Sequence, residues 1–156
     1  VGVTGLFLGY YLPWDGYANA LIAQASGFET LSHTVEGSVV NYENVDNHQT
    51  GIHDYFKFLK FGFGRATDIA CLHLRRGRIT RQDALDMVRR HDGKFPWTYL
   101  DKPIEQILAP LDLTVEQFVK ICDRFTNKKI FLKDAKGNLV KDKRGNLTKL
   151  NDDNPA

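Results

Sequence analysis

The sequence predicts a mainly helical protein with a small β-meander near its C-terminus, and two observations lead to this prediction. After residue 50, apolar residues recur at intervals of three and four, which places them on one side of a helix. Residues 128–150 instead carry the motif D-x-x-G-N-L twice, and turn signals between alternating apolar residues are typical of short strands. We therefore expect a helical part over residues 1–127 and a meander with a tail over residues 128–156.

Length and composition predict one domain with a buried core, since the chain has 156 residues and a hydrophobic content of 42%. Residue 1 is valine and the only methionine is Met87, so we expect a fragment of a longer protein. The apolar run over residues 1–12 lacks a basic start and is too short to span a bilayer. We expect it to form a buried strand or loop without a membrane role, and we expect a cytoplasmic protein.

The first helix is expected between Asp15, whose side chain is well placed to cap it, and Gly27. Aromatic residues precede this helix and fit two interpretations, packing in the core or lining a ligand site. They are Tyr10, Tyr11 and Trp14.

Residues 29–46 have the composition of a loop, and a short strand at Ser38–Tyr42 fits part of the pattern. Hydrogen-bonding side chains crowd together at its end: Asn41, Tyr42, Glu43, Asn44 and Asp46. This composition suits the binding of ligand hydroxyl groups, and a solvated surface loop has the same composition.

Residues 51–80 are expected to form two helices with a glycine joint. The first helix has an apolar stripe at Ile52, Tyr55, Phe56, Leu59 and Phe63. Its polar side consists of His53, Asp54, Lys57 and Lys60. Gly62 and Gly64 break this helix, and the second helix, which ends at Gly77, has inner residues at Ala66, Ile69, Ala70 and His73.

Arg65 and Asp68 lie one turn apart at the start of the second helix. They fit two interpretations, an ordinary i, i+3 ion pair on a solvated face, or a fixed cation and a fixed carboxylate at a helix start that favours anions. The spacing does not choose between them.

Two histidines also need an interpretation. His53 is next to Asp54 and either takes part in acid/base chemistry or substrate contact, or makes a structural hydrogen bond. Adjacent helical residues diverge by about 100°, so the two side chains need not cooperate. His73 lies on the apolar side, and we expect a core histidine there.

Three further helices have clear start signals. Thr80 with Asp83, and Thr114 with Gln117, have the spacing of a capping box. Pro103 is expected to open a short helix between them.

The sequence lacks the motifs of several classes of enzymes and binding sites. A Walker or Rossmann phosphate loop, a G-x-S-x-G motif and an H-E-x-x-H motif are all absent. Cys71 and Cys122 lie far apart in apolar patterns, which predicts buried free thiols. The five histidines have no ligand spacing, so we expect no metal site.

The charge distribution is uneven. Residues 1–50 contain no Lys or Arg, whereas residues 57–90 contain nine bases and three acids, which would attract a phosphorylated ligand or partner. A basic helical module that binds nucleic acid is therefore the alternative hypothesis. The aromatic residues of this region follow the core stripe, and buried rings cannot stack on bases, so we consider nucleic acid an unlikely partner.

Beyond these patterns, several segments of the sequence resemble a known family. The segments that carry the resemblance are GYYLPWDGYANALIAQASGFET, NYEN, GIHDYFKFLKFGFGRATD and RRGRIT, and the similarity extends from about Gly5 to Asn154. They resemble the C-terminal half of the N-acetyl sugar amidotransferases that act in lipopolysaccharide and flagellin-glycan biosynthesis, of the Pseudomonas O-antigen and pseudaminic-acid type.

The resemblance implies the helical, substrate-side C-terminal lobe of a PP-loop ATP pyrophosphatase. In such enzymes ATP adenylates an amide or carboxyl oxygen, pyrophosphate leaves, and ammonia attacks the activated carbon. In this family a sugar acetamido group becomes an acetamidino group. Ammonia is expected from a glutaminase that works with a cyclase-like subunit, both similar to those of imidazole glycerol phosphate synthase.

The family's phosphate-binding Ser-Gly-Gly-x-Asp-Ser loop is absent from this chain. The ATP and Mg²⁺ site and the N-terminal ATP-binding domain are therefore expected upstream of Val1, and this chain alone should be inactive.

The resemblance also suggests roles for residues. We expect Arg65 and Lys60 to face phosphate, and Asp68 and Asp54 to face the sugar or ammonia, with His53 as a further catalytic candidate. The N-acetylated sugar or nucleotide sugar would contact the remaining candidates: Asn41, Tyr42, Glu43, Tyr55 and Lys57.

Overall fold

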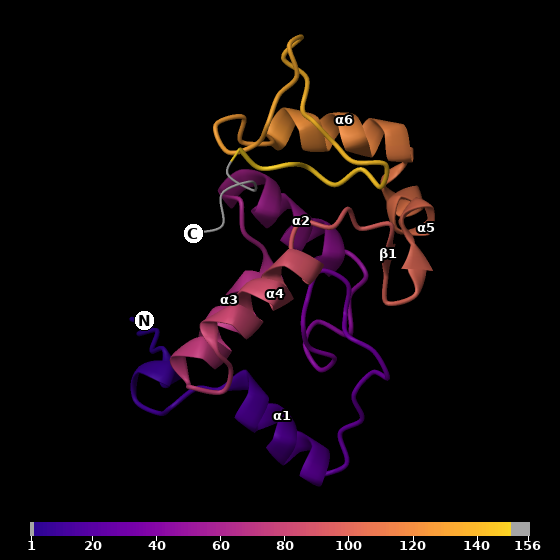
Figure 1. Ribbon diagram of the computed structural model, residues 1–156. Helices are drawn as coiled ribbons and strands as arrows, with labels where there is room; N and C mark the ends of the chain where they lie inside the picture. Colours follow the sequence, from indigo (N-terminus) through magenta and orange to yellow (C-terminus); the bar gives the residue numbers. More distant parts are fainter. Residues whose placement is uncertain (1, 151–156) are drawn as a thin grey trace. The chain divides into compact units, whose positions relative to one another are not determined.

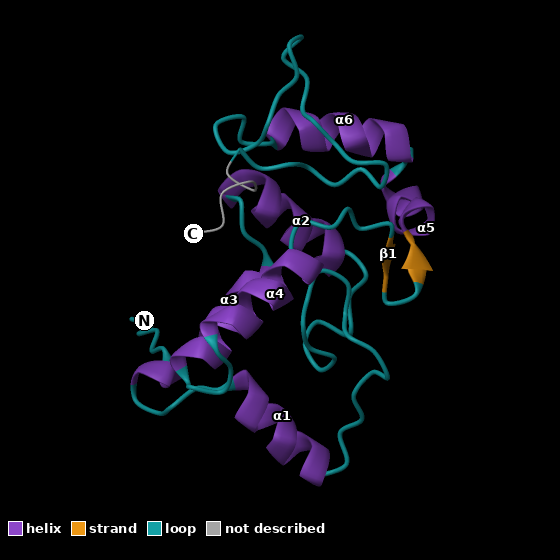
Figure 2. Ribbon diagram, viewed as in Figure 1, coloured by secondary structure: helices purple, strands orange, loops and turns teal. Residues whose placement is uncertain are grey.

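The computed structural model describes residues 2–150 and confirms a mainly helical fold (Figures 1 and 2). The helices are α1 Gly16–Ala25, α2 Thr50–Phe61, α3 Arg65–Arg75, α4 Arg81–His91, α5 Ile104–Leu108 and α6 Val115–Phe125. Two 3-10 turns, η1 Leu8–Tyr10 and η2 Ala109–Leu111, and one antiparallel pair of strands, β1 Thr98–Tyr99 and β2 Lys102–Pro103, complete the described elements. Instead of one domain, the chain forms two compact units that divide between Thr30 and Leu31.

The first unit contains η1 and α1. As predicted, Asp15 caps α1, because its Oδ1 accepts hydrogen bonds from the backbone N–H groups of Tyr17, at 3.1 Å, and Ala18, at 3.4 Å. The expected burial of residues 1–12 is wrong for the described residues 2–12, which are exposed. Of the two expected forms, strand or loop, these residues take the loop, with the 3-10 turn η1 within it. A strand is stable only when its backbone groups find partners, and no described strand pairs with residues 2–12.

The aromatic residues before α1 are not core residues either. Tyr10, Tyr11 and Trp14 are exposed, and the two tyrosine rings pack on each other in an edge arrangement at 5.4 Å.

The second unit has its main core between α2 and α6, which pack against each other. Its buried residues include Tyr55, Phe58 and Leu59 of α2 and Phe118 and Cys122 of α6. The α2 stripe differs from the prediction because the helix is covered on two sides. Phe56 packs on Phe118 and Phe125, whereas Phe58, which was off the predicted stripe, packs on Phe131.

The glycine joint between α2 and α3 forms as predicted. Gly62 ends α2 in the left-handed conformation, at φ 77°, and its N–H donates to the Phe58 carbonyl. The inner residues Ala66, Ile69 and Ala70 of α3 are buried, and α3 packs against α4. His73 is only half-buried and lies 3.5 Å from an Arg78 nitrogen, so the expected core histidine is wrong.

Local signals in the sequence predicted the later helix starts correctly. Capping boxes are formed at Thr80 with Asp83 and at Thr114 with Gln117, and Pro103 precedes the first residue of α5. Residues 31–46 form a loop, and the strand suggested at Ser38–Tyr42 is absent. The backbone carbonyls of Val40 and Asn41 accept from N–H groups of the same loop, those of Val35 and Leu31 respectively.

The meander near the C-terminus is reduced to three isolated antiparallel bridges. Leu132, Val140 and Thr148 form a closed ring of backbone hydrogen bonds, in which each N–H donates to the carbonyl of another member. Asp134 and Asp142 organise the two D-x-x-G-N-L turns, since each carboxylate accepts from the backbone N–H groups two and four residues later. Phe131 and Leu147 join the core of α2 and α6, and the boundary at residues 127 and 128 stays a prediction.

Gly93 is required by packing, which gives a first prediction. It has a φ of 70°, and a Cβ at this position would overlap the Phe58 ring. We expect Gly93→Ala to lower the free energy of unfolding by about 1–3 kcal/mol more than its control does, because overpacking of a core costs that amount.

The matched control is Gly137→Ala, where φ is 84° and a Cβ would contact nothing within 4 Å. Both variants bear the backbone cost of a left-handed alanine, and only Gly93→Ala bears the clash. Urea unfolding of the two variants and the parent chain measures the difference, and equal losses would contradict the packing role.

Candidate functional site

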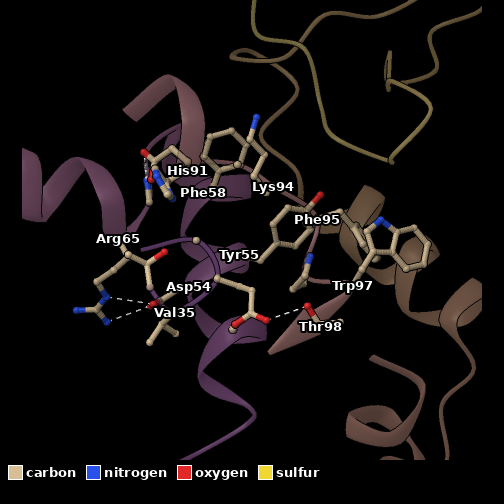
Figure 3. Close-up of a pocket in the computed structure, with 18 of the residues that line it drawn as sticks. Val35, Asp54, Tyr55, Phe58, Arg65, His91, Lys94, Phe95, Trp97 and Thr98 are labelled. Atoms are coloured by element: carbon tan, nitrogen blue, oxygen red, sulfur yellow. Dashed lines mark hydrogen bonds and ion pairs between the residues drawn. The ribbon is translucent and has the colours of Figure 1, made fainter. Parts of the chain in front are cut away.

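The second unit contains a cavity of about 310 Å³ between the loop, the central helices and the segment after α4. Its wall includes residues 34–37 of the loop, Asp54 and Tyr55 of α2, Arg65 of α3, and residues 90–98 (Figure 3). Ligand cavities in proteins commonly have volumes of about 300–1,000 Å³, so this cavity is large enough for a small ligand.

An ion pair between Asp54 and Arg65 forms one wall of the cavity. The Arg65 Nε and Nη2 atoms donate to the two Asp54 carboxylate oxygens, each at 3.1 Å. The Asp54 side chain is only 12% exposed and that of Arg65 29%. The hydrogen bond with Asp54 is the main cause that raises the pKa of Arg65 above its ordinary value, so the guanidinium is a fixed cation with one edge occupied.

This pair replaces the pairing that spacing suggested between Arg65 and Asp68. Asp68 instead forms an ion pair with Lys57 of α2. Two ion pairs therefore cross the glycine joint and connect α2 to α3, and Asp68 lies outside the cavity, beside Phe63 and Cys71.

His53 lies close to the ion pair and outside the cavity. Its Nδ1 is 3.3 Å from Asp54 Oδ1, although the two residues are adjacent in the helix. The His53 side chain is 79% exposed and contacts the Asp54 carboxylate from outside the cavity.

Most other predicted substrate residues do not reach the cavity. Tyr55 does, but its side chain is buried and its ring packs on Phe95 at 5.4 Å, and burial is the main cause that raises its pKa. Lys60 lies over the Phe125 ring, and Asn41 donates to the Leu31 carbonyl within its own loop. Tyr42, Glu43 and Lys57 are half-buried and do not line the cavity.

Glu36 is a cavity residue that the sequence did not single out. One of its oxygens accepts from the Thr98 hydroxyl at 2.8 Å, and the other accepts from the Leu100 N–H at 3.2 Å. It therefore ties the loop to the turn after β1, where Leu100 and Asp101 have positive φ angles. Such angles are unusual for residues other than glycine and need support from their surroundings.

The segment after α4, residues 92–98, also lines the cavity, which the sequence patterns did not predict. The second D-x-x-G-N-L turn, residues 142–147, holds this segment in place. Asn146 Oδ1 accepts from the Phe95 N–H at 2.8 Å, and Trp97 Nε1 donates to the Arg144 carbonyl at 2.7 Å. The indole of Trp97 remains 45% exposed at the cavity. Only the run of charged and aromatic residues before Pro96 could have suggested this role from the sequence.

Asp92 connects this segment to the start of α3. Its Oδ2 accepts from the Gly64 N–H at 2.9 Å and from the Thr67 hydroxyl. Gly64, the N-cap residue of α3, has no side chain for this task, so a residue from the end of α4 supplies the cap. Its Oδ1 is buried without a hydrogen-bond partner among the described residues.

The described residues offer no metal site and no membrane helix. Between residues 2 and 150, no group of three His, Cys, Asp or Glu side chains could hold a metal ion. No helix in that range is long and apolar enough to cross a membrane. Both cysteines are free thiols, of which Cys122 is buried and Cys71 is half-buried.

The aromatic residues of the basic region, which the nucleic-acid hypothesis would use for base stacking, differ in exposure. Tyr55 is buried as expected, whereas Phe61 and Phe63, expected to be buried, are exposed. They lie where α2 ends, and Phe63 already has the Lys57 ammonium over its ring.

The partial burial of Asp54 predicts that its pair with Arg65 is more strongly coupled than the pair of Lys57 and Asp68. Contacting residues have coupling energies of about 0.5–3 kcal/mol, and we expect Asp54 and Arg65 near the upper value. The pair of Lys57 and Asp68, in which the Asp68 side chain is 44% exposed, should give less than about 1 kcal/mol. Double-mutant cycles with alanine, followed by urea unfolding, measure both, and equal couplings would contradict the prediction.

His91 predicts a pH dependence. Burial lowers its pKa from the ordinary value of 6.5, and the charges of Arg90 and Lys94 lower it further. The unfolded chain then binds a proton before the folded chain does, so stability falls as the pH falls below 6.5. Between about pH 7 and about pH 5, the free energy of unfolding of His91→Gln should fall by less than that of the parent chain. Parallel curves would refute this.

The family comparison agrees with the resemblance, over a shorter range of residues. A model described as "LPS biosynthesis protein WbpG-like, C-terminal domain" matches residues 36–144, more than two thirds of the chain and nearly all of the cavity wall. The expected similarity over residues 5–35 and 145–154 lies outside this match. No curated protein matches the chain. The chain therefore belongs to the family of WbpG-like LPS biosynthesis proteins, and residues 36–144 match the C-terminal domain of that family.

Proposed function

We propose that this chain is the substrate-side part of an ATP-dependent amidotransferase, which converts a sugar acetamido group to an acetamidino group in LPS or flagellin-glycan biosynthesis. The observation that carries the proposal is the Asp54–Arg65 pair on the wall of a cavity in an LPS biosynthesis domain. In the proposed reaction the acetamido oxygen leaves with AMP, and ammonia supplies the new nitrogen.

The cavity wall has the groups that such a substrate needs. Asp54 and Glu36 have carboxylate oxygens, which accept hydrogen bonds from sugar hydroxyls or from ammonia. The exposed face of Trp97, which its bond to the Arg144 carbonyl holds in place, suits the apolar face of a sugar ring.

Arg65 and Asp54 have distinct proposed roles. Asp54 occupies one edge of the guanidinium. The remaining N–H groups of Arg65 can donate to the acetamido oxygen when its bond to carbon breaks and negative charge develops on it as part of the leaving AMP. Asp54 keeps Arg65 in this orientation and is one hydrogen bond from the exposed His53.

The other components belong to the proposal as well. We place the ATP and Mg²⁺ site in a part of the protein that precedes Val1. Ammonia would come from a glutaminase that works with a cyclase-like subunit.

The reaction can be tested with the longest reading frame that contains this chain. Incubation with ATP, ammonia and candidate N-acetylated nucleotide sugars should yield AMP, pyrophosphate and a product lighter by the difference between O and NH. Mass spectrometry measures the product. Unchanged sugar with every candidate, or salt-sensitive RNA binding by the isolated chain, would count against the proposal.

Variants of the same protein test the assigned residues. Loss of one well-placed donor to a developing oxyanion costs about 10²–10³ in rate, so we expect Arg65→Lys and Asp54→Asn to lower kcat/KM by about that factor. Asp68→Asn, outside the cavity, should have a much smaller effect. Lys120→Ala is the control, because Lys120 pairs with Glu116 on an exposed face of α6. Normal turnover in Arg65→Lys would remove Arg65 from the mechanism.

A further inference from the structure

Three residues with nitrogen-bearing side chains line the cavity within a run of five positions, 90–94. Arg90 and His91 end α4, and Lys94 begins the segment after it. Figure 3 shows His91 and Lys94 on either side of the Phe58 ring. Arg90 and Lys94 both act on His91 electrostatically, so each cation lies within electrostatic range of the ring.

Within the part of the chain that the structure describes, no carboxylate forms an ion pair with Arg90 or Lys94, although Asp92 acts electrostatically on His91. Asp92, the nearest acid in the sequence, directs one oxygen to the Gly64 N–H and the Thr67 hydroxyl. Its other oxygen is buried against Gly64. Asp142 also acts on Lys94 electrostatically, but its oxygens accept N–H groups of its own turn.

The donors of this group are available. Among residues 2–150, no carboxylate lies within ion-pair distance of Arg90 or Lys94. Arg90 Nε donates to the neutral Asp86 carbonyl, which leaves both Nη groups. By contrast, Asp54 occupies one edge of Arg65, and Lys60 lies outside the cavity.

We propose that Arg90, His91 and Lys94 form an anion subsite of the cavity that takes a phosphate or diphosphate group of the ligand. The Arg90 guanidinium can donate two parallel hydrogen bonds, Lys94 adds a point charge, and the neutral His91 ring donates one N–H. Two cations match a dianion better than the single charge of a sugar carboxylate. The inference rests on the proposed function and moves phosphate binding from Arg65 and Lys60 to these residues.

The subsite also orients the ligand. Three carboxylates line the cavity. That of Asp92 is bound by the Gly64 N–H and the Thr67 hydroxyl, whereas those of Glu36 and Asp54 come from the loop and from α2, where an anion would be repelled and hydroxyl groups can donate. A phosphate at Arg90 and Lys94 therefore places the sugar toward Asp54, Arg65 and Trp97.

Inorganic pyrophosphate is the probe for this proposal. Calorimetry on this chain at low salt should detect pyrophosphate binding that Arg90→Gln and Lys94→Gln each weaken by about tenfold, as expected for one charge-assisted interaction. Lys120→Gln and Lys136→Gln remove the same charge from exposed sites and should leave binding unchanged. Equal losses in all four variants would indicate a general charge effect and would overturn the proposal. Glucuronate binding as tight as that of pyrophosphate would also overturn it.

The His91 ring gives a second readout. A bound dianion favours the imidazolium, so pyrophosphate should raise the pKa of His91 in an NMR titration. His91→Gln identifies the resonance, and Lys94→Gln should reduce the shift. A pKa of His91 that stays constant at saturating pyrophosphate would overturn the proposal.

These measurements need no turnover, which separates the two proposals. Pyrophosphate binding without any amidination would retain the subsite and reject the reaction. Amidination by a protein in which pyrophosphate does not bind at this position would reject the subsite alone.

Discussion

The position of α3 relative to α2 is the constraint on which the site depends, and it is set at a joint of three residues. Gly62 turns the chain in a conformation that few other residues adopt. Beyond the joint, Arg65 reaches back to Asp54 and Lys57 reaches forward to Asp68. Because the ion pairs cross the joint in both directions, they fix the orientation of the two helices, and the partly buried Asp54–Arg65 pair faces the cavity.

The start of α3 connects this joint to the segment after α4. Asp92 caps α3 from the end of α4, so the residues that follow it begin next to the joint. Gly93 lies against the Phe58 ring, and Phe95 packs on Tyr55. The core of the second unit therefore carries one face of the segment after α4, and the other face lines the cavity.

Two turns from distant parts of the chain complete the wall. Glu36 holds the hairpin turn after β1, and Asn146 holds Phe95 through its backbone N–H. Of the two D-x-x-G-N-L turns, which have the same internal hydrogen bonds, the second contacts this segment. The internal repeat thus provides one turn that supports the cavity and one that is exposed to solvent.

Local sequence signals determined the helices and turns of this protein. Asp15, the capping boxes at Thr80 and Thr114, and the aspartates of the two turns bond to backbone groups within four residues of themselves, so a short window of sequence is enough to predict them. Periodicity found α2 but placed Phe58 off its core face, since a single stripe cannot describe a helix that is covered on two sides. The family resemblance likewise depended on the sequence alone. The tertiary structure decided which charges meet, because Asp54 and Arg65 are eleven residues apart, Glu36 and Thr98 sixty-two, and Phe95 and Asn146 fifty-one. Spacing constrains a side chain only to its own helical face, whereas packing between elements selects its partner.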